Sequence, residues 1–413
     1  MTQKKAIGLF SLPVIVAALG YFVDIYDLLL FGIIRKDSLG EKGLQLSIEV
    51  SDRIGMIILN WQMAGLLIGG ILWGMMGDKK GRLSVLFGSI ILYSTANILN
   101  GFVHNVDQYI VCRFIAGIGL AGELGAGITL VSELIPKEKR SIATSIVAGV
   151  GLTGAIAAYF IAQSFGWRNC FFIGGGLGIM LLFLRVSVFE SGMYATVKES
   201  DVKKGNFLMF FTNKYRFKKY LFSILIGTPC WYVIGMLITF SNKFSENLGF
   251  PKDEKVIPGK AVMLAYVAIS IADLLIGLVS HVLKSRKKAM YIFYTLTIIG
   301  IVLYFSGLNN SVFSMYAIIM LLGFGTGFWA LFVTMAAEHF GTNLRATAAT
   351  TAPNMVRGSL IIMTFIFYGL QEQFKISYVL SGEITGVIVM IISSIALILT
   401  EETYAKDLNF LEK

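Results

Sequence analysis

Acidic and basic side chains lie within long apolar stretches of this 413-residue sequence, at spacings that could support proton or anion chemistry. Asp24 and Asp27 are three residues apart, so a helix places both carboxylates on one face. Two buried carboxylates this close disfavour double ionisation, and one of them is therefore expected to hold a proton near neutral pH. The alternative is a structural ion pair with Arg113, which begins another apolar stretch and could also neutralise these acids or contact an anion.

Two further charges lie deep in apolar stretches. Glu123 is surrounded by glycines that leave room beside its carboxylate, so it is a candidate proton carrier or an acid near a substrate; the alternative is a hydrogen-bonded packing acid. Arg357 lies roughly 15 Å into its predicted helix. Arginine keeps its charge, and its guanidinium matches carboxylate or phosphate. It predicts an anionic substrate if it faces a cavity, whereas a buried pair with Asp273 would leave the substrate class open.

Uncharged polar and aromatic residues at similar depth could complete a substrate site. Buried amides need hydrogen-bond partners, which favours Gln62 and Asn354. The aromatic residues are expected as helix packing at least as often as ligand contacts. The candidate substrate-binding residues beside Arg357 are Tyr26, Gln62, Trp231, Trp329 and Asn354.

The elements that must position these residues are membrane-spanning helices. Apolar residues make up 56% of the chain and charged residues 15%, against about 25% charged residues in soluble domains. Twelve apolar runs are long enough to cross a bilayer. They cover residues 8–34, 52–76, 83–103, 107–132, 141–164, 167–187, 219–243, 260–283, 288–306, 311–337, 347–370 and 376–400.

The two halves of the chain repeat each other. Glu133 precedes Arg140 by seven residues in SELIPKEKRSIAT, and Glu338 precedes Arg345 by seven in AEHFGTNLRATAA, 205 residues later. The repeat predicts an all-α membrane protein of two pseudo-symmetric six-helix bundles with a site between them. We expect bundles at residues 1–190 and 218–413, joined by a cytoplasmic linker at 191–217.

Charge and cysteine content exclude several other classes. The net charge of +10 lies in short loops between apolar runs, which favours anchoring to an anionic leaflet over nucleic-acid binding. Lysine and arginine are more frequent in the loops of one side of the membrane than in those of the other. This positive-inside bias predicts an inner-membrane protein with both termini in the cytoplasm. The three cysteines and three histidines form no metal or catalytic motif, so we expect no cofactor, no metal and no enzymatic activity.

The loop GMMGDKKGRLSV at residues 74–85 resembles the signature loop of the major facilitator superfamily, with Gly74, Asp78, Gly81 and Arg82 in place. In the second copy, GLVSHVLKSRKK, His281 replaces the aspartate. GYFVDIYDLLLFG and RFIAGIGLAGELGAG are similar to stretches of the phosphate:proton and aromatic-acid:proton symporters. EHFGTNLRAT, with Arg357 after it, resembles organic-anion carriers. The resemblance covers essentially the whole chain and implies the twelve-helix fold of this family.

The resemblance implies a monomeric secondary active transporter that works by alternating access. We expect a proton-coupled symporter of a small organic or phosphorylated anion, and the alternative is a facilitator or exporter of a neutral or zwitterionic metabolite. Proton coupling would involve Asp24, Asp27, Glu123 and Arg113. Charges at the cytoplasmic ends of helices would close the inner side. These gating candidates are Asp78, Arg82, Glu133, Arg140, Glu338 and Arg345.

Overall fold

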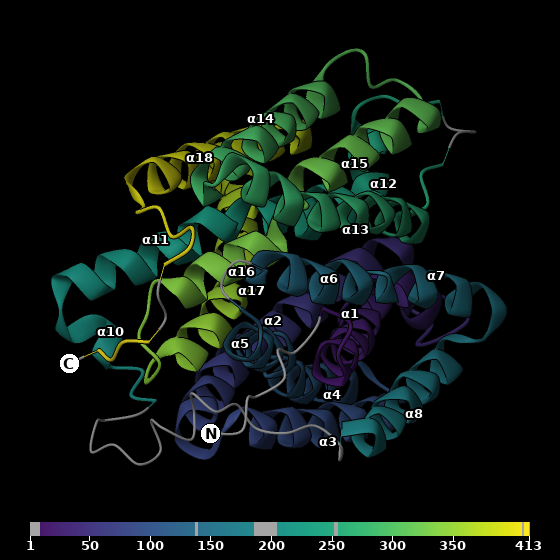
Figure 1. Cartoon of the computed structure of the whole chain (residues 1–413). Coiled ribbons are helices and arrows are strands. Elements are labelled where there is room, and N and C mark those ends of the chain that lie inside the picture. The colour runs from purple at the N-terminus through teal and green to yellow at the C-terminus, as the bar shows by residue number, and fades with distance from the viewer. Residues whose placement is uncertain (1–8, 137–138, 186–204, 252–254, 407–408, 413) are drawn as a thin grey trace.

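The computed structural model describes residues 9–136, 139–185, 205–251, 255–406 and 409–412, without the side chains of residues 48, 49, 52, 140 and 141. Every regular element within these residues is a helix. Figure 1 shows the helices of the first half, α1 to α8, in purple to dark teal, beside those of the second half, α10 to α18, in teal through green to yellow. This arrangement confirms the predicted fold of two six-helix bundles.

In the first half of the chain the last described helix ends at Arg185, and the described helices of the second half begin with the short helix α10. The first contains α1 (Leu12–Leu39), α2 (Ile48–Lys80), α3 (Arg82–Asn100), α4 (Val106–Leu120), α5 (Glu123–Leu134), α6 (Arg140–Leu152), α7 (Gly154–Ser164) and α8 (Trp167–Arg185). The second part contains α10 (Met209–Thr212), α11 (Lys214–Trp231), the π-helix η1 (Tyr232–Ile238), α12 (Ser241–Asn247), α13 (Pro258–Leu283), α14 (Arg286–Phe305), α15 (Val312–Thr326), α16 (Trp329–Glu338), α17 (Arg345–Phe374) and α18 (Tyr378–Leu399). Most of the predicted linker lies outside the described residues, so the domain boundaries stay a prediction.

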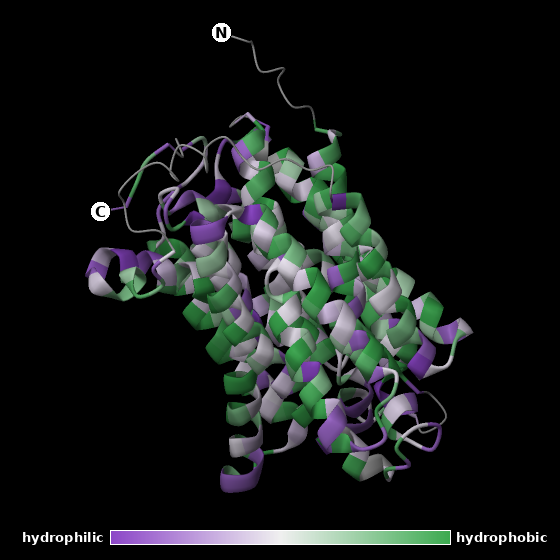
Figure 2. Ribbon diagram, turned by 90° about the horizontal axis from the view of Figure 1, so that it is seen from below, coloured by the Kyte–Doolittle hydropathy of each residue, from purple (hydrophilic) through white to green (hydrophobic). Residues whose placement is uncertain are grey.

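Eleven helical segments in the described part of the chain are long and apolar enough to cross a membrane. The remaining predicted span, the eleventh in chain order, is α17, which is 30 residues long but carries Asn354, Arg357 and many threonines. Apolar residues cover the middle of the molecule, and hydrophilic ones gather toward its two ends (Figure 2). This distribution matches a bilayer around the middle.

Several spans that the sequence predicts as single helices are interrupted. The fourth breaks after Leu120, at the end of α4, and the tenth breaks after Thr326, at the end of α15. These breaks lie 206 residues apart, close to the repeat of 205, so they are part of the pseudo-symmetry. Interrupted membrane helices expose backbone groups that need partners. The seventh span contains η1 directly after Pro229, which lies inside α11.

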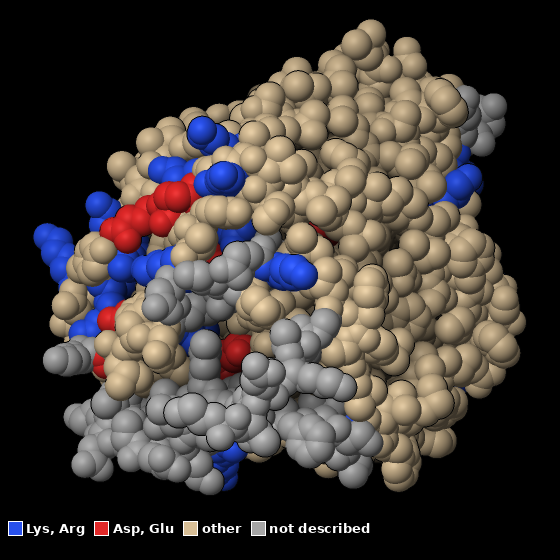
Figure 3. Space-filling view, in the orientation of Figure 1, with Lys and Arg blue, Asp and Glu red and all other residues tan. Residues whose placement is uncertain are grey.

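The bundles meet mainly where α2 packs on α17 and α6 packs on α13. Lysine, arginine and acidic side chains gather at the end of the molecule where α10, α11 and the C-terminus lie (Figure 3). We call this end, where α2 meets α3 and α17 begins, the charged face, and the other end the opposite face. Between the bundles, the opposite face has a cleft with about 1440 Å³ of empty space, bordered by Asn60, Phe240 and Tyr378 among others.

Candidate functional site

Asp27 of α1 is held by Arg113 of α4. The Arg113 guanidinium lies 3.4 Å from Asp27 Oδ1, donates to Asn97 Oδ1, and stacks 4.8 Å from the ring centre of Phe171. All of these partners belong to the first bundle, and both charged side chains are fully buried. Asp27 therefore forms the ion pair with Arg113 that the structural alternative predicts.

Glu123 is paired with Arg185 at the end of α8. The guanidinium donates to both carboxylate oxygens, with Nη1 to Oε2 at 2.9 Å, and also to the Leu86 carbonyl at 3.1 Å. A methyl group at Gly20 of α1 would overlap both Arg185 and Glu123, so glycine provides the space for this pair. Arg185 was not predicted as the partner of Glu123. A buried cation at the end of an apolar run was the signal that an acid must lie nearby.

Asp24 has a different environment from the other two acids. It is completely buried, and the nearest cationic atom, Arg357 Nη2, lies 3.9 Å from its Oδ2. Neither carboxylate oxygen accepts a hydrogen bond from a described residue. The contact also joins the bundles, since Asp24 belongs to α1 and Arg357 to α17. A buried carboxylate without donors lacks the hydrogen bonds that would compensate for burial of its charge.

Arg357 lines a small central cavity between the bundles. Its guanidinium lies 5.6 Å from the Trp329 ring centre. The buried indole N–H of Trp329 has no hydrogen-bond acceptor among the described residues. The remaining wall is aromatic and aliphatic with a few hydroxyl and thiol groups. It is formed by Tyr21, Ile25, Leu28, Leu152, Cys230, Trp231, Ile234, Tyr266, Ile269 and Thr326.

Three of the predicted substrate contacts do not line this cavity. The Tyr26 hydroxyl donates to the Cys170 carbonyl at 2.8 Å, and Gln62 donates to the Leu28 carbonyl at 3.2 Å. Asn354 accepts from Arg357 Nη1 at 3.1 Å and donates to the Ala121 carbonyl at 2.8 Å. Asn354 therefore positions Arg357, while Trp231 and Trp329 are in the wall as expected.

Asp273 does not pair with Arg357. Its carboxylate accepts from the backbone N–H of Ala330 at 2.9 and 3.2 Å, in the first turn of α16. A carboxylate at a helix N-terminus satisfies an otherwise unpaired N–H and interacts favourably with the helix dipole. Asp273 thus stabilises the interruption in the tenth span. The acid that contacts Arg357 is Asp24.

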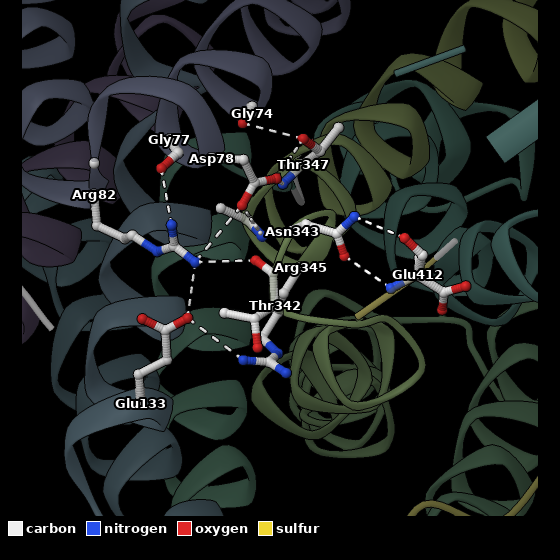
Figure 4. A network of polar contacts seen from close by, with 12 residues as sticks. Gly74, Gly77, Asp78, Arg82, Glu133, Thr342, Asn343, Arg345, Thr347 and Glu412 are labelled. Carbon is white, nitrogen blue, oxygen red and sulfur yellow. Dashed lines mark hydrogen bonds and ion pairs between the residues drawn. The ribbon is translucent and has the colours of Figure 1, made fainter. Parts of the chain in front are cut away.

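On the charged face, ion pairs join the two bundles (Figure 4). Glu133 Oε1 lies 2.8 Å from Arg82 Nη2 in its own bundle and 3.4 Å from Arg345 Nη1 in the other. Arg82 also donates to the Gly77 carbonyl at 3.0 Å and lies 3.6 Å from Asp78. Four of the six gating candidates therefore lie together.

Asp78 also caps a helix of the opposite bundle. It accepts from the N–H groups of Ala346 and Thr347, at 3.2 and 2.8 Å, and from the Thr347 hydroxyl at 2.6 Å. The N-cap residue of α17, Leu344, has no side-chain cap of its own. Gly74 lets α2 approach so closely that an added Cβ would lie 3.1 Å from Thr347 Cα. The glycine and aspartate of the signature loop thus serve one contact between the bundles.

The second copy of this arrangement is different. Glu338 pairs with Arg286 at 3.0 Å, the counterpart of the Arg82–Glu133 pair, within the second bundle. His281, at the aspartate position, lies 3.4 Å from the Tyr404 hydroxyl. The side chain of Arg140 lies outside the described residues, so its predicted part in gating stays a prediction.

Comparisons with known proteins agree with this architecture. The family model described as Major Facilitator Superfamily matches residues 9–364. The sialic acid transporter NanX of Escherichia coli is 28% identical over 381 residues, 89% of this chain and 89% of that protein. The gentisate transporter of Corynebacterium glutamicum is 27% identical over 340 residues, 79% of this chain and 73% of that protein.

Among solved structures, that of the proton:xylose symporter XylE bound to 6-bromo-6-deoxy-D-glucose is similar, with a TM-score of 0.75. The match covers 96% of this chain and 97% of that one at 17% identity, which shows a common fold. The two bundles, the cavity between them and the signature loop at their junction are all in place. The chain therefore belongs to the Major Facilitator Superfamily of membrane transporters.

Proposed function

We propose that this protein is a proton-coupled symporter of a small organic monoanion, which it moves by alternating access to the central cavity. The observation that carries the proposal is the loose contact of 3.9 Å between Asp24 and Arg357 at the cavity. A proton on Asp24 would release Arg357 to bind a substrate carboxylate. A carboxylate that exchanges an arginine for a proton is a two-state element of the kind that coupling requires.

Asp24 is a better proton site than the other two acids. Asp27 and Glu123 each contact an arginine within hydrogen-bond distance in their own bundle, so each acid already has a close partner for its charge. Asp24 receives no such donor from the described residues. We therefore narrow the candidate proton carriers to Asp24, and assign Asp27, Glu123 and Arg113 to holding the first bundle together.

The cavity walls favour an organic anion with a compact apolar body. Arg357 is the cation in the lining, and Trp329 adds one buried N–H donor. Together they could hold one carboxylate, because both donors match its oxygens. Tyr21, Trp231 and Tyr266 offer apolar surface to the rest of the ligand. Two relatives are named as transporters of sialic acid and of gentisate, both of them carboxylic acids.

We infer that the charged face is cytoplasmic and lies at an inner membrane, as the bias of lysine and arginine predicts. With this orientation the protein is closed toward the cytoplasm by the Asp78–Arg82–Glu133–Arg345 contacts and hollowed on the outer side. Proton and substrate would enter from the outside, and the bundles would then rock about the central cavity. We propose that a single chain suffices for this cycle.

The test uses purified protein in liposomes, with benzoate, gentisate and sialic acid as radiolabelled candidates. We expect an inward proton gradient to drive accumulation of one of these acids by the wild type. Asp24→Asn should retain exchange of labelled for unlabelled substrate but lose gradient-driven accumulation, because the substituted side chain cannot release a proton. Asp37→Asn is the matched control: Asp37 is on the same helix, but its side chain is 53% exposed.

Arg357→Gln should abolish binding of the anion in the same preparation. Accumulation by Asp24→Asn that still follows the proton gradient would contradict the proposed coupling. Transport of a neutral solute that survives in Arg357→Gln would favour the facilitator alternative, with Arg357 as a purely structural partner of Asp24.

A further inference from the structure

A patch of exposed apolar and basic side chains lies around α10 and the start of α11, where the seventh membrane span begins. It consists of Leu208, Phe211, Lys214, Phe217 and Lys218, and we call it the interfacial patch. We infer that the interfacial patch binds the headgroup region of anionic phospholipids in the leaflet at the charged face, and that bound lipid stabilises the closed contacts between the bundles.

The apolar side chains of the patch are exposed. Leu208 is 67% exposed, Phe211 51% and Phe217 39%, and the rings of Phe211 and Phe217 lie 5.7 Å apart. The side chains between them, Phe210, Arg216 and Tyr220, are buried against the protein. The segment thus has an inner and an outer surface, as expected for an element lying along an interface.

The position of the patch identifies its surroundings. The apolar segment Lys214–Ile238 is long enough to cross the membrane, so its first turn lies where the bilayer meets water. Figure 1 shows α10 and the start of α11 at the edge of the molecule, beside the C-terminus. Aromatic rings and lysines are typical of this depth, since each has an apolar body and a polar end.

The charge of the patch selects anionic headgroups. Residues 206–220, NFLMFFTNKYRFKKY, contain four basic residues and no acid. Arg216 and Lys219 contact Glu412 and Glu401 at 4.0 and 3.6 Å, whereas Lys214 and Lys218 are exposed. Two exposed lysines beside exposed rings suit a phosphodiester whose acyl chains enter the bilayer next to the protein.

The inner surface of this segment leads to the contacts between the bundles. The ring of Phe210 stacks on Tyr220 at 4.3 Å and meets Phe340 edge-on at 5.0 Å. The Gly205 N–H donates to the Asn343 carbonyl at 3.1 Å. Asn343 comes two residues before Arg345, which contacts Glu133 of the other bundle. Lipid that orders the segment therefore orders the loop from which α17 begins.

The first experiment measures thermal stabilisation of the full-length protein in detergent by soluble dioctanoyl phosphatidylglycerol. Dioctanoyl phosphatidylcholine and free glycerol phosphate are run in parallel. We expect only phosphatidylglycerol to stabilise the wild type. The double variant Lys214→Gln/Lys218→Gln should need about thirtyfold more of this lipid, at roughly fivefold per lysine. Equal stabilisation by phosphatidylcholine, or by glycerol phosphate, would overturn the inference.

The matched control is Lys284→Gln/Lys288→Gln, which removes the same charge from exposed positions of the same face. An equal loss of affinity for phosphatidylglycerol in this control would mean that the lipid is attracted to the charged face in general, and would overturn the assignment to the interfacial patch. Hydrogen exchange tests the link to the bundles: phosphatidylglycerol should slow exchange of the Ala346 and Thr347 amides in wild type but not in the patch variant. Unchanged exchange in wild type would refute that link.

Discussion

Removing the carboxylate of Asp78 should open the charged face. In the closed arrangement this one side chain accepts from the N–H groups of Ala346 and Thr347 and from the Thr347 hydroxyl. Once the bundles separate, water can satisfy both partners. Asp78→Ala therefore removes stabilisation from the closed state and little from the open one.

The size of the effect follows from two contributions. Loss of an N-cap costs about 0.5–2 kcal/mol, and loss of a negative charge at a partly buried helix N-terminus costs up to roughly 2 kcal/mol. We take about 2–3 kcal/mol together, which shifts the equilibrium between closed and open states roughly 30- to 140-fold. Asp78→Asn should lose less, because an amide oxygen can still cap the helix without supplying the charge.

Hydrogen exchange at Ala346 and Thr347 is the direct assay, since these two amides donate to Asp78. Their exchange in Asp78→Ala should be faster by the same factor as the shift in equilibrium. The control is His281→Ala at the pseudo-equivalent position, where the side chain contacts Tyr404 of its own bundle and no effect on these amides is expected. Wild-type exchange rates in Asp78→Ala would refute the capping argument. Equal rates in the two alanine variants would refute the expected difference between Asp78 and the pseudo-equivalent His281.

Three other predictions concern single residues. Gly20→Ala should lower the unfolding temperature markedly, because its methyl group would displace the Glu123–Arg185 pair and disturbing a buried pair costs roughly 3–5 kcal/mol; thermal unfolding in detergent measures this. Trp329→Phe keeps an aromatic wall but removes the indole N–H, so the substrate concentration for half-maximal uptake should rise roughly tenfold or more, and an unchanged value would show that this donor does not bind substrate. Burial lowers the pKa of His339 to about 3 from 6.5, so between these values the unfolded chain binds a proton that the folded chain does not. The free energy of unfolding should therefore fall on acidification below about pH 6.5, by up to roughly 1.4 kcal/mol per pH unit. The difference between the free energies of unfolding measured at about pH 7 and about pH 5 should be smaller in His339→Leu than in wild type.

The sequence predicted the helices and their repeat because both depend on signals that are local or periodic. A run of apolar residues must span the bilayer wherever its neighbours lie. The interruptions at Gly122 and Gly327 could not be predicted from these residues, because glycines are common in membrane helices. In the tenth span a tertiary contact stabilises the interruption: the Asp273 carboxylate, 57 residues from Ala330 in sequence, satisfies a freed N–H group.

The partners of the buried charges could not be read from spacing. Asp24 and Asp27 share a face of α1 by their separation, yet Asp27 meets Arg113 of its own bundle and Asp24 meets Arg357 of the other. α1 contacts several helices at once, so residues three apart can face different neighbours. For the same reason the hydrogen bonds of Tyr26 and Gln62 to backbone carbonyls within the first bundle could not be predicted, and their contact with substrate stays a prediction.

Of the three buried acids Asp24, Asp27 and Glu123, only Asp24 contacts an arginine of the other bundle among the described residues, and this difference gives a reason for coupling transport to a proton. Asp27–Arg113 and Glu123–Arg185 lie within one bundle, so rocking of the bundles need not disturb either pair. Asp24–Arg357 joins the bundles, and it is also the pair with the longest separation of the three. An anion that bound Arg357 while Asp24 stayed ionised would leave an excess negative charge in a closed, water-poor cavity, and a proton alone would leave an excess positive one. Both states oppose closure. Only the empty carrier with Asp24 ionised and the loaded carrier with Asp24 protonated are balanced. The proposed mechanism therefore requires one proton per monoanion, and a measured ratio other than one would mean that a second buried acid takes part.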